Sequence, residues 1–372
     1  MLRRIVQRAG AAQFRNSTRP LRAHVLRSYA TLSPHTPPPT TPYEVFDEPS
    51  KNRQRDRAII RLREEEQTAG PRAEDADVDP VKVVDYLREE VSERLAERVE
   101  DLRTPPASIL ELAAHSGQLT QILQEVIADE VPSASESRDQ ELERRKWWIV
   151  ESSTEALQRD DDSHFSSPPI RIQASASRLL EHPEIEKLKE QVEAVVSGGG
   201  LHWVGDIVGA LTQIRHLLKP DGVFVGAVLG GDTLFELRTS LQLAEQERRG
   251  GIANRISPMI NPTDAPSLLN RAGFTLTTID VEDMTINYPS IWELVSDLRD
   301  MGESNAILGR RAHVSRDVLL AADAIYKELY GNEDGSVPAT FQIIFLIGWK
   351  PGPNQPKALE RGSATTSLKD VL

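Results

Sequence analysis

The chain has 372 residues, a formal net charge of −13 and no cysteine, and these facts exclude several classes of protein. Disulfide scaffolds, thiolate zinc sites and cysteine nucleophiles are excluded because each of them needs cysteine. The acidic balance argues against binding to nucleic acid, and no run reaches the roughly 18 apolar residues that a membrane span needs. The length allows about two domains, or one large α/β domain with a helical part added.

The first 43 residues contain no acidic side chain and carry seven arginines. An arginine-rich, acid-free N-terminus is typical of a mitochondrial presequence. The motif Arg27-Ser28-Tyr29-Ala30 resembles a processing site that is cut after the aromatic residue. Residues 1–29 are therefore the predicted presequence, and the mitochondrial matrix is the predicted compartment. A disordered basic tail that binds anions is the alternative.

Residues 30–80 are expected to form a linker and an N-terminal extension that are partly disordered. Ser33–Pro42 is rich in proline and threonine, which favours an extended linker. Val45–Arg63 carries mixed charges and is expected to be helical at its end. Glu64–Pro80 is acidic and interrupted by glycine and proline, so we expect a mobile loop there.

The next part of the chain predicts a helix followed by several strands. Apolar residues at helical spacing from Val83 to Val99 indicate an amphipathic helix, whose expected role is core packing. Short apolar runs after it predict four strands. Their expected positions are Ser108–Leu112, Trp147–Glu151, Ile170–Gln173 and the end of Glu184–Val195, where the chain opens into Ser197-Gly198-Gly199-Gly200.

The following stretch predicts a helix, a strand and a second helix. The helical spacing from Ile207 to Leu218 is stopped by Lys219-Pro220-Asp221-Gly222, because proline cannot continue a helix and Asp-Gly suits a turn with positive φ. Val223–Val228 is the expected strand. Thr233 with Glu236 then predicts a capping box for the second helix.

These elements predict a right-handed βαβ unit of a parallel sheet. Ligands of such sheets lie beyond the carboxyl ends of the strands. Ser197–Trp203 and Gly230–Thr233 are therefore expected at the functional edge. The remaining elements are expected to be helices at Ala265–Ala272, at Pro289–Met301 and from Val318 to Leu329, and strands at Phe274–Ile279 and Phe341–Trp349.

Several blocks of this sequence resemble a known family. LHWV, LKPDGVF and GGDTLFELRTSLQLAE, all within Leu201–Glu245, resemble the late motifs of class I S-adenosylmethionine-dependent methyltransferases. More narrowly, the chain resembles the mitochondrial complex I assembly factor 5 family, whose bacterial relatives are the malonyl-carrier-protein methyltransferases of biotin synthesis. VFDEPSKNRQRDRAI, DYLREEVSERLAERVEDL, MGESNAI, LYGNEDGSVPATFQIIFLIGWKP and ERGSAT match in the same order, so the resemblance covers most of Val45–Thr365.

The resemblance implies an α/β fold with a Rossmann-like, seven-stranded, mostly parallel methyltransferase sheet and helical additions. The methyltransferase-like domain is expected at residues 81–351, with a helical insertion at about 289–330 and a C-terminal tail at 352–372. The last strand is expected to insert antiparallel beside the one before it. The implied activity is hydroxylation of an arginine on a complex I subunit or assembly intermediate, with S-adenosyl-L-methionine as cofactor. Contact with the inner membrane would be at most peripheral.

The expected cofactor site departs from the family pattern at its glycine turn. Methyltransferases of this class continue their first strand into Gly-x-Gly-x-Gly, whereas this chain has Ala113-Ala114-His115-Ser116-Gly117. Each lost glycine adds a Cβ where the amino-acid end of the cofactor should lie. The family's acidic residue after the third strand is also missing, since the chain has Ala174-Ser175-Ala176-Ser177 there. A non-catalytic assembly scaffold and a conventional methyltransferase therefore stay open as alternatives.

Six residues are predicted to contact the cofactor: Glu111, Ala113, Gly117, Glu151, Ser197 and Gly198. Glu151 ends the second strand, where a carboxylate suits the ribose hydroxyls. An ordinary exposed acid at a strand end is the alternative for Glu151.

Four further residues are predicted to be catalytic or to hold the target: His202, Asp232, Glu303 and Asn305. His202 suits an acid or base beside Trp203, which walls the pocket or packs as a lid. Asp232 suits a guanidinium, or supports the entry of a helix. Glu303 and Asn305 lie in a polar, non-periodic segment that is expected to face the functional edge.

One motif has the spacing of a metal site. His182-Pro183-Glu184 matches the first two ligands of an iron site built from two histidines and a carboxylate. Pro183-Glu184 also suits the first turn of an ordinary helix, and we favour that interpretation. No metal site is predicted.

Overall fold

The computed structural model describes residues 44–69, 84–129, 144–311 and 313–356. The predicted presequence (1–29), residues 30–43 and 70–80 of the predicted linker and extension, and the tail from residue 357 lie outside these ranges. Within them, no helix is both long enough and apolar enough to cross a bilayer.

A seven-stranded sheet forms the centre of the molecule, in the order β3-β2-β1-β4-β5-β7-β6. Neighbours among the first five strands pair in parallel, and β7 runs antiparallel between β5 and β6. The predicted sheet and its antiparallel last strand are both confirmed. The strands are β1 (Ser108–Leu112), β2 (Lys146–Glu151), β3 (Ile170–Gln173), β4 (Val192–Ser197), β5 (Leu218–Leu229), β6 (Thr275–Tyr288) and β7 (Val337–Trp349).

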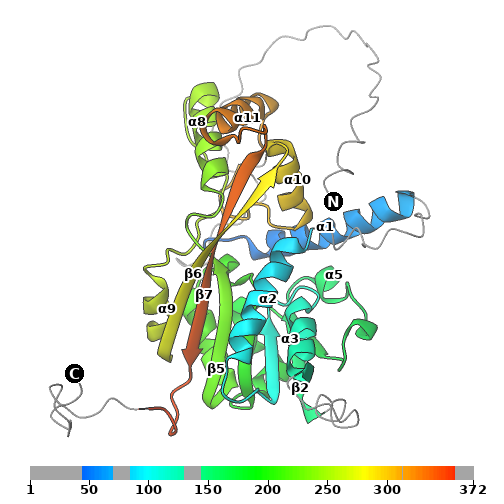
Figure 1. Cartoon of the computed structure of the whole chain (residues 1–372), viewed down its shortest axis with the longest axis vertical. Coiled ribbons are helices and arrows are strands. Elements are labelled where there is room, and N and C mark those ends of the chain that lie inside the picture. The colour runs from blue at the N-terminus through cyan, green and yellow to red at the C-terminus, as the bar shows by residue number, and fades with distance from the viewer. Residues whose placement is uncertain (1–43, 70–83, 130–143, 312, 357–372) are drawn as a thin grey trace, which may run out of the picture.

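Helices cover the sheet and gather at one end of it. They are α1 (Glu48–Ala69), α2 (Tyr86–Glu100), α3 (Gln118–Asp129), α5 (Thr154–Leu157), α6 (Pro183–Glu186), α7 (Ile207–Leu217), α8 (Phe235–Arg249), α9 (Ala265–Arg271), α10 (Ile291–Asp300) and α11 (Arg316–Tyr330). Two large apolar clusters hold the helices other than α1 and α5 to the sheet, one including Leu95 and Phe345 and the other Leu211 and Phe224. Figure 1 shows α8 and α11 together where β6 and β7 extend beyond the sheet.

The strand order reverses between β1 and β4, which lie side by side although β2 and β3 separate them in the chain. A parallel sheet opens a crevice at such a point, on the side where the strands end. Leu112, Glu151 and Ser197 are the last residues of β1, β2 and β4, so the segments that follow them meet at this carboxyl edge. Helix α1, which precedes the first strand in the chain, runs across the same edge (Figure 1).

Two local predictions are corrected. The loop expected from Glu64 is wrong as far as Ala69, because α1 continues through these residues. Strand β5 begins at Leu218 instead of Val223, because Leu218 already pairs with Val192 of β4. Asp221 N also donates to Lys350 O (3.2 Å), and Lys350 N donates to Gly222 O (2.8 Å). The helix ends at Leu217, one residue before the expected end, and Asp221 is the residue of the turn motif that has positive φ (64°).

The predicted capping box of Thr233 and Glu236 is wrong. Helix α8 begins after Leu234, and both side chains bond to β7 instead. The Thr233 hydroxyl accepts from Gln342 N and donates to Gln342 O, both at 3.1 Å, and Glu236 accepts from the Thr340 amide. Burial explains the difference, because Thr233 is fully buried and the strand's polar groups beside it need partners.

Replacing Thr233 by valine tests this link to β7. The isosteric change removes the acceptor of the buried Gln342 N–H, so we expect unfolding free energy to fall by about 1–2 kcal/mol. Chemical denaturation measures the loss, and Thr278→Val, at an exposed position of β6, is the matched control. Equal stabilities of the two variants would contradict the assignment.

Candidate functional site

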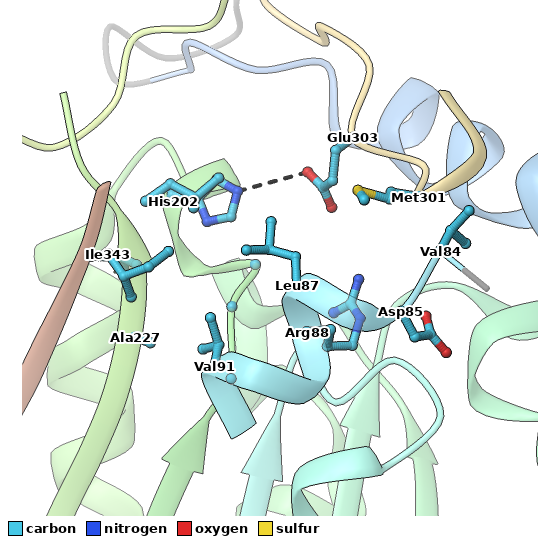
Figure 2. A pocket seen from close by; sticks show the side chains of 15 residues that line it. Val84, Asp85, Leu87, Arg88, Val91, His202, Ala227, Met301, Glu303 and Ile343 are labelled. Atoms are coloured by element: carbon cyan, nitrogen blue, oxygen red, sulfur yellow. Dashed lines mark ion pairs between the residues drawn. The ribbon is translucent and has the colours of Figure 1, made fainter. Parts of the chain in front are cut away.

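Two neighbouring pockets open at the carboxyl edge. The apolar pocket lies between α2 and the ends of β4 and β5 (Figure 2). Leu87, Val91, Ala227, Met301 and Ile343 are among its apolar walls, and Arg88, His202 and Glu303 also line it. The second pocket lies under α1, where Lys51, Arg55, Ala113, Ser152, Ala174 and Trp203 line it. Gly200 lines both, so the two pockets are parts of one site.

The degenerate glycine turn keeps an unusual backbone. Ala113, His115 and Gly117 have φ values of 53°, 52° and 91°. Residues other than glycine adopt positive φ only at a cost in conformational free energy. Ala113 lines the second pocket, and its Cβ would be 2.7 Å from a Cβ added to Gly200. Gly117 lines neither pocket, because a Cβ there would meet the ring of Phe165 at 3.0 Å. The lost glycines have therefore not abolished the turn.

Glu111 lies behind this turn rather than in either pocket. It is buried, and its Oε2 accepts from the Thr120 backbone N (2.9 Å) and hydroxyl (2.6 Å) in the first turn of α3. Burial raises the pKa of Glu111 to about 7, although the two Thr120 donors lower it. In this structure Glu111 positions α3.

The raised pKa of Glu111 makes folding stability depend on pH. The folded carboxyl holds its proton from its ordinary pKa of 4.5 up to about 7, so its contribution is complete below 4.5 and is lost as pH rises through 7. The loss is on the order of 3 kcal/mol by linkage. Glu111→Gln should remove this slope between pH 4.5 and 7, measured by urea unfolding. Glu125→Gln, exposed on α3, is the control, and a Glu111→Gln curve parallel to the wild type would contradict the assignment.

Glu151, at the end of β2, holds the glycine turn and α1 together. Its carboxylate accepts from the backbone N–H groups of His115 (2.9 Å), Ser152 (2.8 Å) and Ser153 (3.0 Å), and it pairs with Arg55 at 3.3 Å. Burial raises its pKa, but Arg55 and these donors outweigh burial and lower it. The alternative of an ordinary exposed acid is wrong, because Glu151 is 1% exposed.

The segment after β4 forms the floor of the apolar pocket. Gly198, Gly199 and Gly200 line it, and the last two have φ of 135° and 95°. Ser197 is buried, and its hydroxyl donates to Gly199 O at 3.4 Å, which holds the loop.

Helix α1 is tied to the site by a cluster of charged residues, which we call the clasp: Lys51, Arg55, Glu151 and Glu303. Lys51 Nζ donates to Glu303 Oε2 (3.0 Å) and to Gly302 O (2.8 Å). Arg55 lies between the two acids, 3.3 Å from Glu151 and 3.6 Å from Glu303. Both cations are almost fully buried, so the acids compensate charges that would otherwise be costly.

Glu303 is the centre of this cluster. Its Oε2 also accepts from Trp203 Nε1 (2.5 Å) and lies 3.8 Å from His202 Nε2. Figure 2 marks the pair of Glu303 and His202 with a dashed line. Burial raises the pKa of Glu303, but the nearby charges, Lys51 above all, hold it well below its ordinary value. Burial lowers the pKa of Lys51 to about 7 and also lowers that of His202. The site thus combines an ionised carboxylate with a neutral imidazole.

Arg88 brings a further positive charge to the apolar pocket from the first turn of α2. Figure 2 shows its guanidinium directed into the pocket beside Leu87. It forms no hydrogen bond or ion pair with any residue in the described ranges. Burial lowers its pKa from the ordinary arginine value. An arginine without a partner in an apolar pocket is a candidate anion-binding group.

The predicted residues therefore divide into two groups. His202, Glu303 and Gly198 meet at the apolar pocket, whereas Asp232 and Asn305 line neither pocket. Asp232 is exposed and accepts from Gln342 Nε2 at 3.3 Å. The Asn305 amide bonds to Ser257 and to Asn254 O, which fixes neighbouring loops.

Sequence reasoning missed Lys51, Arg55 and Arg88. Lys51 and Arg55 lie in the matching block VFDEPSKNRQRDRAI, so an available signal was not connected to the site. The interpretation of Pro183-Glu184 as a helix start is confirmed by α6. Within the part of the chain that is described, no group of three or more His, Asp or Glu residues is placed to hold a metal ion.

Comparison with known proteins defines the class. Residues 85–279, which span β1 to β5, match the family described as "Methyltransferase domain", in agreement with the sheet. A "Malonyl-[acyl-carrier protein] O-methyltransferase" of Halorhodospira halophila is 28% identical over 81% of this chain and 93% of its own. The chain is therefore a methyltransferase-domain protein.

Higher similarity identifies the particular family. The proteins named "Arginine-hydroxylase NDUFAF5, mitochondrial" of Danio rerio and Homo sapiens are 42% and 43% identical to this chain. The aligned regions cover 77% of this chain in both cases, and 82% and 76% of those relatives. The chain belongs to the NDUFAF5 family.

Proposed function

We propose that this protein is a mitochondrial arginine hydroxylase that binds S-adenosyl-L-methionine and modifies a complex I subunit or assembly intermediate in the matrix. The observation that carries the proposal is the ionised, partly buried carboxylate of Glu303 at the carboxyl edge, in a chain whose relatives are named arginine hydroxylases. A carboxylate in low-dielectric surroundings suits a guanidinium target.

The residues of the apolar pocket fit the amino-acid end of the cofactor. Arg88 offers an unpaired positive charge for its carboxylate, and Gly198 to Gly200 let the backbone approach closely. The second pocket, with Ala113 and Ala174, is the proposed place of the nucleoside. Glu151 keeps its predicted role toward the ribose, which requires Arg55 to move from its carboxylate.

Hydroxylation replaces a C–H bond with C–OH, and with O2 it also consumes two electrons and two protons and releases water. O2 and the electron donor come from outside this chain in the proposal. The chain's own residues bind and orient the target. His202, neutral because burial lowers its pKa, is placed to take a proton at a ring nitrogen.

The predicted organisation completes the proposal. Residues 1–29 direct the protein to mitochondria and are removed, and residues 81–351 form the methyltransferase-like domain, with a tail at 352–372. The names of the relatives support the compartment. Contact with the inner membrane is at most peripheral.

Conventional methyl transfer is the second candidate, because the malonyl-carrier-protein methyltransferase of Halorhodospira halophila aligns along most of the chain. The two activities differ in the mass added to the product and in the source of the added atom. A scaffold without cofactor is the third candidate, which the departures at Ala113 and His115 favour.

Arg88→Met tests the cofactor site directly. Loss of the charge should weaken binding of S-adenosyl-L-methionine by about 10- to 100-fold, the usual effect of losing a charge-assisted hydrogen bond. Titration calorimetry on the chain from Ala30 measures this. Arg94→Met, on the same helix but paired with Glu90 and Glu282, is the control and should bind as the wild type does. No binding by the wild type would favour the scaffold.

Mass spectrometry of complex I tests the activity. Cells that lack their own family member and express this chain should contain a subunit arginine heavier by one oxygen atom, labelled when ¹⁸O2 is supplied. Glu303→Gln should lower the modified fraction by about tenfold or more, since a neutral amide replaces the charge that pairs with the guanidinium. A methylated product without hydroxylation would overturn the proposal in favour of the second candidate.

A further inference from the structure

The surroundings of Glu303 are complementary to a guanidinium group. Its ionised carboxylate lies at the edge of the Trp203 ring, where it accepts from Nε1 at 2.5 Å, and Lys51 Nζ lies over the face of the same ring, 3.4 Å from its centroid. Carboxylates and indole faces both attract planar cations. The chain places two cations of its own, Lys51 and Arg55, beside Glu303. The site therefore already binds positively charged side chains.

His202 supplies a second, independent observation. It is 8% exposed, yet neither of its ring nitrogens has a hydrogen-bond partner among the residues that the structure describes. Figure 2 shows the ring directed toward Glu303, and the 3.8 Å between Nε2 and Oε2 is too long for a hydrogen bond. An imidazole nitrogen without a partner can accept from an N–H group, and a guanidinium carries five of these.

Arg55 occupies this place only loosely. A well-fitted arginine forms two hydrogen bonds of about 2.7–2.9 Å to one carboxylate. Arg55 instead divides its guanidinium between Glu151 (3.3 Å) and Glu303 (3.6 Å), and its buried Nε has no hydrogen-bond partner within the described part of the chain. The acids of the clasp therefore retain capacity for a guanidinium with better geometry.

Helix α1 is suited to leave the site. Among its described side chains, the buried apolar ones are Ala58, Ile59 and Leu62, so little apolar area holds it. Most of its other anchors are polar, including the partly exposed pair of Arg63 and Glu155. Displacing Lys51 and Arg55 would also free Glu151, which the proposed cofactor site requires.

We infer that Glu303, His202 and the face of Trp203 bind the guanidinium of the target arginine, and that Lys51 and Arg55 occupy this site as internal surrogates until the target displaces α1. The inference rests on the proposed function, because it names the substrate-binding residues of the same site. It identifies the ligand as an arginine side chain within a peptide.

The test measures binding without turnover. The probe is N-acetyl-L-arginine methylamide, titrated into residues 30–372, the chain without its predicted presequence. The neutral citrulline analogue is the matched control ligand. Lys51→Met with Arg55→Met should tighten arginine binding by about tenfold or more, because the probe no longer competes with internal cations. Adding Glu303→Gln to this double variant should return the affinity to the wild-type level or below. Arg57→Met, at an exposed position of the same helix, should leave affinity unchanged.

Equal or weaker arginine binding by the folded double variant would overturn the inference, as would equal binding of the citrulline analogue. Circular dichroism confirms folding, and the single variants Lys51→Met and Arg55→Met replace the double one if it does not fold. Binding as expected without any hydroxylated product in cells would reject the proposed activity and keep the site. Hydroxylation with binding indifferent to these variants would reject the site and keep the activity.

Discussion

The ion pair between Lys51 and Glu303 is the contact on which the arrangement of the site depends. Glu303 lies in the turn after α10, and Lys51 comes from α1, more than 250 residues away in sequence. Taking both charges out of water is costly, and their attraction compensates only when the geometry is good. The pair closes α1 over the ends of β1, β2 and β4, and it draws Trp203 and His202 around the same carboxylate.

Gly302 allows this closure. It has φ of 74°, and a Cβ there would lie 3.0 Å from Arg55 Cα, so the turn before Glu303 approaches α1 as closely as glycine permits. This close approach places the Glu303 carboxylate beside both Lys51 and Arg55. A natural protein rarely buries so many charges for stability alone, since apolar packing would serve as well. The desolvation cost of these charges has a functional reason in the proposed site, where Glu303 binds a cationic ligand.

The fold was predictable from sequence because its signals are local. β1 and β3 were predicted at their observed bounds, and β2, α7 and α9 within one residue, since apolar runs and breakers mark them. The capping box predicted at Thr233 is wrong because the capping pattern considers only nearby residues. The strand that hydrogen-bonds to the Thr233 hydroxyl, β7, is distant in sequence. The tertiary contact with β7 therefore overrode the local preference for a helix cap at Thr233.

The site was only partly predictable, for the same reason. His202 and Glu303 were expected at the functional edge, and both line the apolar pocket there. Asp232 and Asn305 looked equivalent by polarity, but their partners Gln342 and Asn254 are set by tertiary structure. At Ala113 the backbone has the positive φ that glycine usually provides, and the residue type alone does not indicate this conformation.

Hydrogen exchange of α1 tests the central claim most directly. If the pairs to Glu303 hold the helix on the sheet edge, Glu303→Gln should raise exchange of the backbone amides in Glu48–Ala69 by roughly tenfold or more, while α3 stays protected. Unchanged protection of α1 in that variant would contradict the account, because α1 would then be held by its other contacts.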